Sequence, residues 1–130
     1  GSNFLPANLK VGTGFDFINF SGFLFLNKQW KLPQFIFNNL NDAQFISCKL
    51  SRTKFIGCTM NNVIFDNCEF RGEEVCFYKL TGTFIFKNCS IEYTNKWIMT
   101  SELTEIVKIL KFRGLDDRTF KIIDDSIIVL

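Results

Sequence analysis

Five cysteines offer most of the reactive chemistry in this sequence, as nucleophiles, metal ligands or disulfide partners. They are Cys48, Cys58, Cys68, Cys76 and Cys89. The chain contains no histidine, which is both the usual general base for a nucleophile and the commonest metal ligand. No cysteines have the CxxC spacing of a zinc site, so we expect no metal and no other cofactor. The sequence predicts thiols that stay reduced, with Cys48, Cys58 and Cys68 as small core residues.

Paired carboxylates are the other groups with catalytic potential, because two acids can divide the roles of general acid and general base. The pairs are Glu73-Glu74, Asp116-Asp117 and Asp124-Asp125. Adjacent residues of a strand point to opposite faces, and acidic pairs are common in turns and at helix N-termini. No glycine-rich phosphate loop or serine-hydrolase motif accompanies them. We therefore expect a protein that is not an enzyme.

The three cysteines from 48 to 68 are spaced by ten because they belong to a repeat of five residues. A large apolar residue stands at every fifth position over most of the chain. These centres are Phe15, Phe20, Phe25, Trp30, Phe35, Leu40, Phe45, Leu50, Phe55, Met60, Phe65, Phe70, Val75 and Leu80. A helix has a period near 3.6 and a strand a period of 2, so neither element alone explains the pattern.

Each five-residue unit is predicted to direct one large and one small side chain inward and the others outward. The small positions, two residues before the centres, are Ala43, Cys48, Thr53, Cys58, Val63 and Cys68. Four units make a square turn of about twenty residues, and turns stacked at about 4.8 Å form a solenoid. In this geometry Phe35, Phe55 and Val75 should share one column, and Leu40, Met60 and Leu80 another.

The repeat resembles that of the pentapeptide-repeat proteins, commonly written A-(D/N)-L-x-x. The chain has this unit at Ala7-Asn8-Leu9 and close variants at Ala43-Gln44-Phe45 and Val63-Ile64-Phe65. The resemblance covers residues 4–91 and implies an all-β solenoid, a right-handed quadrilateral β-helix. It indicates little about function, because members of the family do many different things.

Two places disturb the predicted solenoid. Lys28 and Pro33 fall on inward positions, and Glu73 does so further along the chain. Burying an unpaired charge is costly, so we expect loops or bulges at both places. The most regular part of the stack is predicted to span residues 34–70.

Residues 94–130 are predicted to form a C-terminal α-helical cap followed by an apolar tail. The apolar residues at helical spacing are Leu103, Ile106, Val107 and Leu110. They predict an amphipathic helix over about 101–113, with Ser101 or Thr100 at its N-terminus. The open end of a solenoid exposes apolar surface and unpaired strand edges, so covering that end would bury the apolar stripe.

The tail leaves alternatives open. It could form a second short helix from Asp117 with an extended end, or a small hairpin that turns at Asp124-Asp125-Ser126. The apolar ending would then pack on the cap, join a homodimer interface or continue into a longer protein.

The formal net charge of +2 bears on the partner. A nucleic-acid-binding domain usually has a strongly basic face, so we expect no nucleic-acid partner. No apolar run approaches the length of a membrane span, and no signal peptide precedes the repeat. The expected location is the cytoplasm, or the cytoplasm of a host cell if the protein is a secreted effector.

The expected function is a non-catalytic protein–protein interaction module or scaffold whose partner is another protein. Some bacterial effectors carry pentapeptide repeats, and the resemblance suggests the repeat segment of such a protein. The alternative is a DNA-mimicking binder of a topoisomerase, as in the quinolone-resistance branch of the family. That role depends on a long acidic rod, whereas a solenoid of this length would extend only about 21 Å at about 4.8 Å per turn.

The candidate partner-contact residues are apolar or cationic side chains at outward positions. They are Ile46, Ile56, Ile64, Lys49, Arg52 and Lys54. Lys49 precedes Glu69 by twenty residues, and Lys54 precedes Glu74 by the same interval. Each of these pairs is therefore predicted to stack on adjacent turns as an exposed ion pair.

Overall fold

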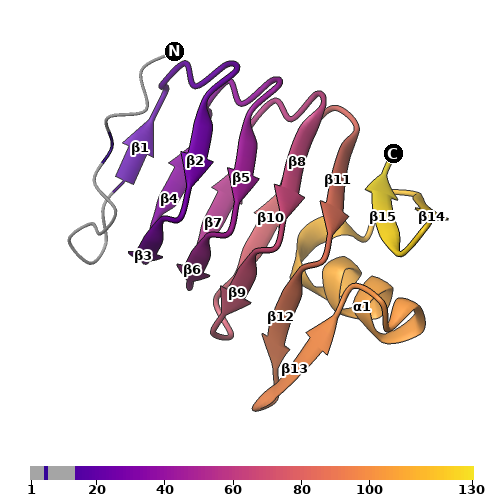
Figure 1. Cartoon of the computed structure of the whole chain (residues 1–130). Coiled ribbons are helices and arrows are strands. Elements are labelled where there is room, and N and C mark those ends of the chain that lie inside the picture. Colours follow the sequence, from indigo (N-terminus) through magenta and orange to yellow (C-terminus); the bar gives the residue numbers. More distant parts are fainter. Residues whose placement is uncertain (1–4, 6–13) are drawn as a thin grey trace.

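The computed structural model describes residue 5 and residues 14–130, so the predicted unit at Ala7-Asn8-Leu9 and the predicted start at residue 4 lie outside the described residues. Short strands follow one another along a spiralling chain whose turns stack side by side (Figure 1). The fold is a mostly β solenoid of about four turns with a short α-helix near the C-terminus. The strands of the stack are β1 (Gly14–Asp16), β2 (Leu24–Leu26), β3 (Gln29–Lys31), β4 (Gln34–Ile36), β5 (Gln44–Ile46), β6 (Lys49–Ser51), β7 (Lys54–Ile56), β8 (Val63–Asp66), β9 (Glu69–Arg71), β10 (Cys76–Tyr78), β11 (Phe84–Lys87) and β12 (Ser90–Tyr93).

Parallel pairing between turns builds the sides of the solenoid. One side is the sheet β1-β4-β7-β10, a second contains β2, β5, β8 and β11, and a third contains β3, β6, β9 and β12. Isolated parallel bridges join Asn19, Asn39, Thr59 and Thr81 on the fourth side. The predicted quadrilateral cross-section is therefore confirmed.

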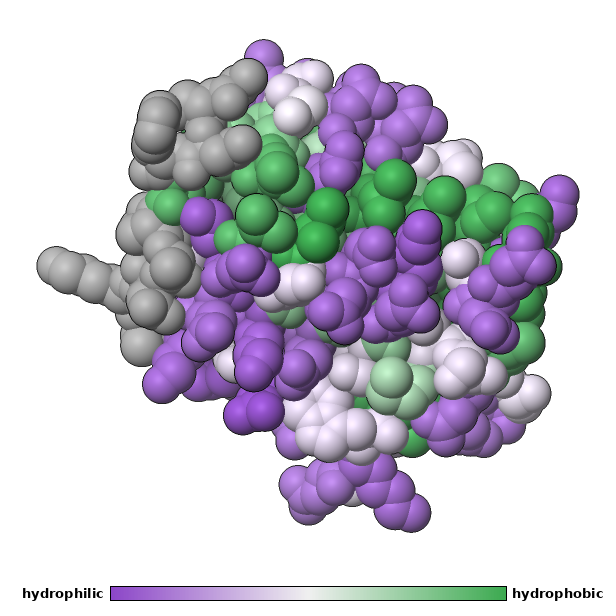
Figure 2. All heavy atoms as spheres, viewed as in Figure 1, coloured by the Kyte–Doolittle hydropathy of each residue, from purple (hydrophilic) through white to green (hydrophobic). Residues whose placement is uncertain are grey.

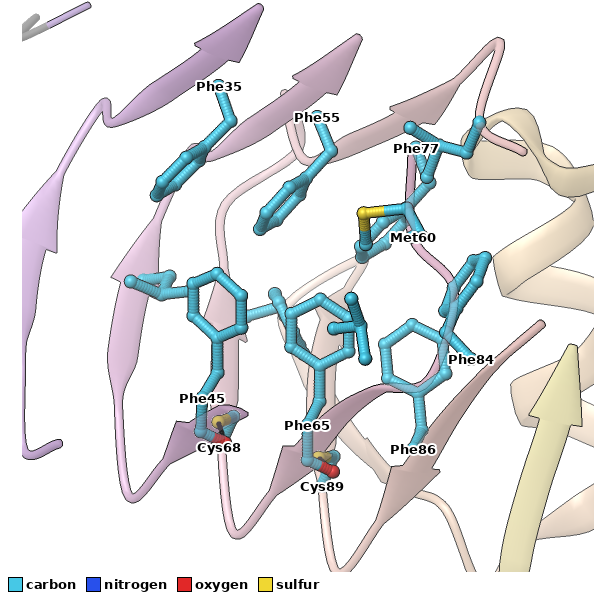
Figure 3. Close-up of a cluster of buried hydrophobic side chains, with 14 of the residues drawn as sticks. Phe35, Phe45, Phe55, Met60, Phe65, Cys68, Phe77, Phe84, Phe86 and Cys89 are labelled. Atoms are coloured by element: carbon cyan, nitrogen blue, oxygen red, sulfur yellow. Dashed lines mark hydrogen bonds between the residues drawn. The ribbon is translucent and has the colours of Figure 1, made fainter. Parts of the chain in front are cut away.

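The centres of the repeat fill the tube with stacked rings. Phe35 pairs in register with Phe55, and their ring centroids lie 4.8 Å apart at an interplanar angle of 4°. Phe45 and Phe65 stack in the same way at 4.9 Å, whereas Phe35 and Phe45 from different columns meet edge to face at 87°. Figure 3 shows the two columns facing each other across the interior. Both arrangements are favourable for aromatic pairs, which accounts for the abundance of phenylalanine.

The square corners depend on a left-handed backbone conformation two residues after each centre. The φ angle is 64° at Asp42, 61° at Asn62 and 66° at Gly57. Asparagine, aspartate and glycine adopt this conformation more readily than other residues. A corner at every fifth residue is what converts the five-residue unit into one side of a square.

The register changes between β9 and β10, and again before β11, where Phe86 pairs with Phe65 at an offset of twenty-one. Pairing is offset by twenty residues up to Arg71, which pairs with Ser51, but Phe77 pairs with Phe55 at an offset of twenty-two. The irregularity predicted at Glu73 is thus confirmed as a two-residue insertion. The prediction that Val75 and Leu80 continue the centre columns is wrong, because the insertion moves both into the positions that small residues occupy in earlier turns.

The loop predicted around Lys28 and Pro33 does not form, because β3 keeps the regular register with β6. Lys28 is buried, and its Nζ donates a hydrogen bond of 2.6 Å to the carbonyl oxygen of Leu5. The carbonyl oxygen of Pro33 accepts from the Thr53 hydroxyl at 3.0 Å and from the Lys54 backbone N–H at 3.1 Å. Because these polar groups are paired, the inward positions need no bulge.

The C-terminal segment folds back onto the last turn of the stack. Its elements are β13 (Lys96–Met99), α1 (Leu103–Leu110), the π-helical segment η1 (Lys111–Leu115), β14 (Phe120–Ile123) and β15 (Ser126–Val129). Strand β13 pairs with β12, and β15 pairs with β11, both antiparallel. Of the two structures open for the tail, the hairpin is the one that forms. It turns at Asp124 and Asp125, where φ is positive.

Helix α1 lies at the C-terminal end of the stack (Figure 1). The predicted stripe is confirmed for Ile106 and Leu110, which are buried in the core together with Ile109. The helix begins two residues later than predicted. Its N-terminal flanking residue is Glu102, whose side chain does not bond to the helix and accepts from the Met99 backbone N–H at 2.7 Å.

Candidate functional site

The cysteine thiols of the regular stack are hydrogen-bond donors within the core. Cys58 Sγ donates to the Phe35 carbonyl oxygen at 3.3 Å, and Cys68 Sγ donates to that of Phe45 at 3.2 Å. Figure 3 shows Cys68 and Cys89 below the phenylalanine columns. Burial raises the pKa of the Cys58 thiol, so the group stays protonated. The prediction of free core thiols is confirmed for Cys48, Cys58 and Cys68, whereas Cys76 is only half-buried.

The acidic pairs do not assemble a reactive site. Glu74 forms an ion pair with Arg52 at 2.7 Å, whereas Glu73 pairs with Arg113 at 3.0 Å. Asp124 and Asp125 form the turn of the C-terminal hairpin. Over the part of the chain that is described, no group of three or more cysteine, aspartate or glutamate residues could hold a metal ion.

The six candidate contact residues are distributed over three sheets and a corner. Ile46 and Ile64 lie in β5 and β8, Ile56 and Lys54 in β7, Lys49 in β6, and Arg52 at the corner between β6 and β7. They do not form a common face. Lys49 is the register neighbour of Glu69 as predicted, but the ion pairs of the described residues do not include this pair. The two-residue insertion places Cys76, not Glu74, beside Lys54, and Glu74 pairs with Arg52 instead.

A band of apolar side chains crosses the outer face of the six-stranded sheet, whose order is β14-β15-β11-β8-β5-β2, between polar residues of the same strands. We call this surface the apolar band. It consists of Leu24, Leu26, Ile46, Ile64, Ile85 and Ile128, all partly or fully exposed. Figure 2 shows hydrophobic residues running across this face, with hydrophilic residues on both sides. Only Ile46 and Ile64 were among the predicted contact residues.

Strand pairing holds the apolar band together. Leu26 pairs with Ile46 on the next turn, and Ile85 stands between Ile64 and Ile128. Ile46 and Ile64 are diagonal neighbours, because Ile46 pairs with Asp66 and Ile64 pairs with Gln44. At one end, the C-terminal hairpin borders a hollow of about 390 Å³ lined by Ile64, Ile85 and Ile128. Lys87, Asp124 and Ser126 contribute polar groups to the same hollow. The band thus ends in a recess with charges of both signs.

A separate apolar surface lies at the corner after β1 and β4. The rings of Phe17 and Phe37 stack at a centroid distance of 5.4 Å. Phe17 is 78% exposed and Phe37 is 53% exposed. Gly57 continues this corner on the next turn, and an added Cβ there would lie 2.5 Å from the Phe37 ring. Glycine therefore leaves the space that the Phe37 ring occupies. Ile56 is at the edge of this surface, in β7.

Stacked parallel strands, inward centres and outward polar and apolar side chains define a β-solenoid repeat protein. Residues 39–72 match the family model described as pentapeptide repeats, in eight copies. Residues 39–72 thus carry the repeats of this family, and the family resemblance drawn from the sequence is confirmed. No curated protein matches the chain. No solved structure matches it either.

Among the helices of the described residues, none combines the length and the apolar character needed to cross a membrane.

Proposed function

We propose that this chain is a protein-binding module that uses the apolar band as its contact surface. Pentapeptide-repeat proteins are generally structural or interaction proteins and not enzymes. The observation that carries the proposal is the extent of the band over the strands β2, β5, β8, β11 and β15. Contiguous exposed apolar surface with polar surroundings is typical of protein-interaction sites.

The construction of the solenoid favours this use. Each band residue is flanked by a core centre such as Phe45 or Phe65, both fully buried, so the backbone beneath the band is held firmly. A surface that is already ordered loses little conformational entropy when it binds. The matching partner is a protein with a flat row of aliphatic or aromatic side chains. Lys87 and Asp124 at the hollow would fix its orientation through charge.

Two settings follow for such a module. In one, the repeat provides the partner-binding part of a larger bacterial effector. In the other, a second copy of the chain is the partner, through β14, which is the edge strand of the six-stranded sheet. Imitation of DNA is not proposed, because the net charge is +2 and exposed cations such as Lys49 and Arg71 interrupt any acidic surface.

Site-specific photo-crosslinking tests the proposal. A photoreactive phenylalanine analogue would replace Ile64 in the apolar band or, as a matched control, Thr59 on the fourth side, in cells that express the protein. We expect a discrete protein adduct at position 64 and none at position 59. Ile85→Asp, next to Ile64 in register, should abolish that adduct while circular dichroism shows an intact fold.

The adducts also separate the possible partners. A crosslink between two copies of the chain would identify a homodimer, and a heavier adduct would identify a different protein. Equal adducts at both positions, or an adduct at position 64 that survives Ile85→Asp, would show that the apolar band is not the binding surface.

A further inference from the structure

The outer face of the five-stranded sheet carries a surface of opposite character to the apolar band. It contains a hollow of about 310 Å³, which we call the polar hollow. Its outward-facing side chains are Gln29, Lys31, Lys49, Ser51, Glu69 and Arg71, two from each of the strands β3, β6 and β9. The shortest of them, Ser51, stands between longer side chains on both neighbouring strands.

The polar hollow has an excess of positive charge. Lys31, Lys49 and Arg71 contribute three cations, against the single carboxylate of Glu69. The ion pairs in the described part of the chain are Arg52–Glu74 and Arg113–Glu73, so the cations of the hollow are not engaged in such pairs there. Three unpaired cations at one place favour an anionic ligand.

The strand register places Lys31, Ser51 and Arg71 side by side on three neighbouring strands. Lys31 pairs with Ser51, and Ser51 pairs with Arg71, so their backbones are successive neighbours about 4.8 Å apart. The long side chains of Lys31 and Arg71 can therefore converge over the Ser51 hydroxyl. In the structure the Arg71 guanidinium lies 5.3 Å from the centre of the Trp97 ring in β13, on the side of β9 away from Ser51. It must therefore turn away from this cation–π contact to reach a ligand over Ser51.

We propose that the polar hollow binds a phosphate monoester dianion. A guanidinium donates two parallel hydrogen bonds to phosphate oxygens, an ammonium group supplies a point charge, and a hydroxyl donates a third bond. A volume of about 310 Å³ leaves room for the group that carries the phosphate. Glu69 lies at the side of the hollow next to Lys49, and its charge limits the affinity for anions. This site is independent of the apolar band, because it lies on a different sheet.

The test is a titration of the whole protein with O-phosphoserine, followed by ¹H–¹⁵N chemical shifts. We expect saturable shifts confined to β3, β6 and β9. Arg71→Gln and Lys31→Ala should each weaken binding about tenfold, the loss of one charge-assisted contact of about 1.4 kcal/mol. Glu69→Gln should strengthen binding. The matched control Lys121→Ala, an exposed cation in β14, should leave the affinity unchanged.

Other probes identify which chemical group of the ligand is bound. Serine should cause no shifts, inorganic phosphate should bind at the same place, and binding should weaken below the second pKa of the phosphate, about 6. Dimethyl phosphate represents the diester of a nucleic-acid backbone, and equal affinity for it would overturn the assignment to a monoester. Shifts spread over all cationic surfaces, or affinity unchanged in both Arg71→Gln and Lys31→Ala, would overturn the site.

Discussion

The regular stack, residues 34–71, and the last turn, residues 72–91, are made from the same five-residue unit. They differ in the offset between paired residues of adjacent turns. In the regular stack each turn repeats the one before it at a constant offset of twenty residues. In the last turn the offset is twenty-two at Phe77 and twenty-one at Phe86. Larger residues, including Leu80 and Phe84, take positions that small residues occupy in the turns before.

The irregularity of the last turn coincides with the attachment of the C-terminal segment. Arg113 donates to the backbone carbonyl and to the side chain of Glu73, inside the two-residue insertion. Arg118 donates to the carbonyl oxygen of Leu80 at 3.0 Å and to that of Gly82. At Gly114, with a φ of 123°, an added Cβ would collide with the Phe77 carbonyl. Regularity thus extends the solenoid, whereas departures from it form the end.

The largest loss of stability is expected from a substitution in the core of the regular stack. Phe55 is fully buried between Phe35 and Phe77 in the same column. Phe55→Asp places an unpaired charge in an apolar interior, which should exceed the stability of a small domain and abolish folding. Circular dichroism and thermal melting measure the effect. Thr59→Asp, at an exposed position four residues later, is the control and should fold normally. A cooperative melt for Phe55→Asp would contradict the inward register.

The buried thiols should make the regular stack sensitive to alkali. The hydrogen bond with Cys68, followed by burial, raises the pKa of Cys48, and burial raises that of Cys58. Their folded pKa values lie above the unfolded value of about 8.5, so their stabilising effect is full below that pH and declines as the pH rises further.

The decline should reach about 1.4 kcal/mol per thiol for each pH unit above 8.5. Denaturant unfolding between about pH 7.5 and 9.5 measures the free energy of unfolding over this window. Cys58→Ala should reduce the slope of the free energy of unfolding against pH by the contribution of one thiol. A free energy of unfolding that stays constant or rises over the same window would contradict the proposed burial of neutral thiols.

The smallest expected change in stability is found by comparing two ion pairs, whose acids are the adjacent residues Glu73 and Glu74. The Arg113 side chain is only 4% exposed, whereas Arg52 is 49% exposed in its pair with Glu74. Arg113→Ala should cost about 1.5–3 kcal/mol because it removes a buried side chain and its charge-assisted hydrogen bonds to Glu73. Arg52→Ala should cost under about 0.5 kcal/mol.

Hydrogen exchange adds spatial resolution to that comparison. Arg113→Ala should increase exchange in α1 and in the hairpin β14–β15 while β4 and β7 remain protected. Equal costs for the two variants, or loss of protection throughout the stack, would mean that Arg113 does not act locally at the end of the solenoid.

The sequence predicted the solenoid because the period of five is imposed by the core at every turn. It failed at Val75 and Leu80 because an apolar residue suits a centre and a small-residue position equally well. A further signal was present at the corners, where Asp42, Asn62 and Gly57 mark left-handed backbone positions. Counting from these corners would strengthen the assignment of the register in the regular stack.

The candidate site was predicted only in part. Leu26 and Ile46 are twenty residues apart, so stacking the outward positions by turn would have extended the apolar band from the sequence. Ile128 was not predictable in this way, because it joins the band through antiparallel pairing of β15 with β11. Such pairing depends on contacts between distant segments, and either structure of the tail satisfied the local sequence.

The constant offset of the regular stack has a consequence for how such a protein can change its length. Duplication of a twenty-residue gene segment within it would add one whole turn, and every new residue would meet a neighbour of the kind already present. The ends would move apart by about 4.8 Å with each duplication. Shorter insertions would displace every later column, as the two residues before β10 do. Evolutionary growth of this molecule is therefore quantised in turns.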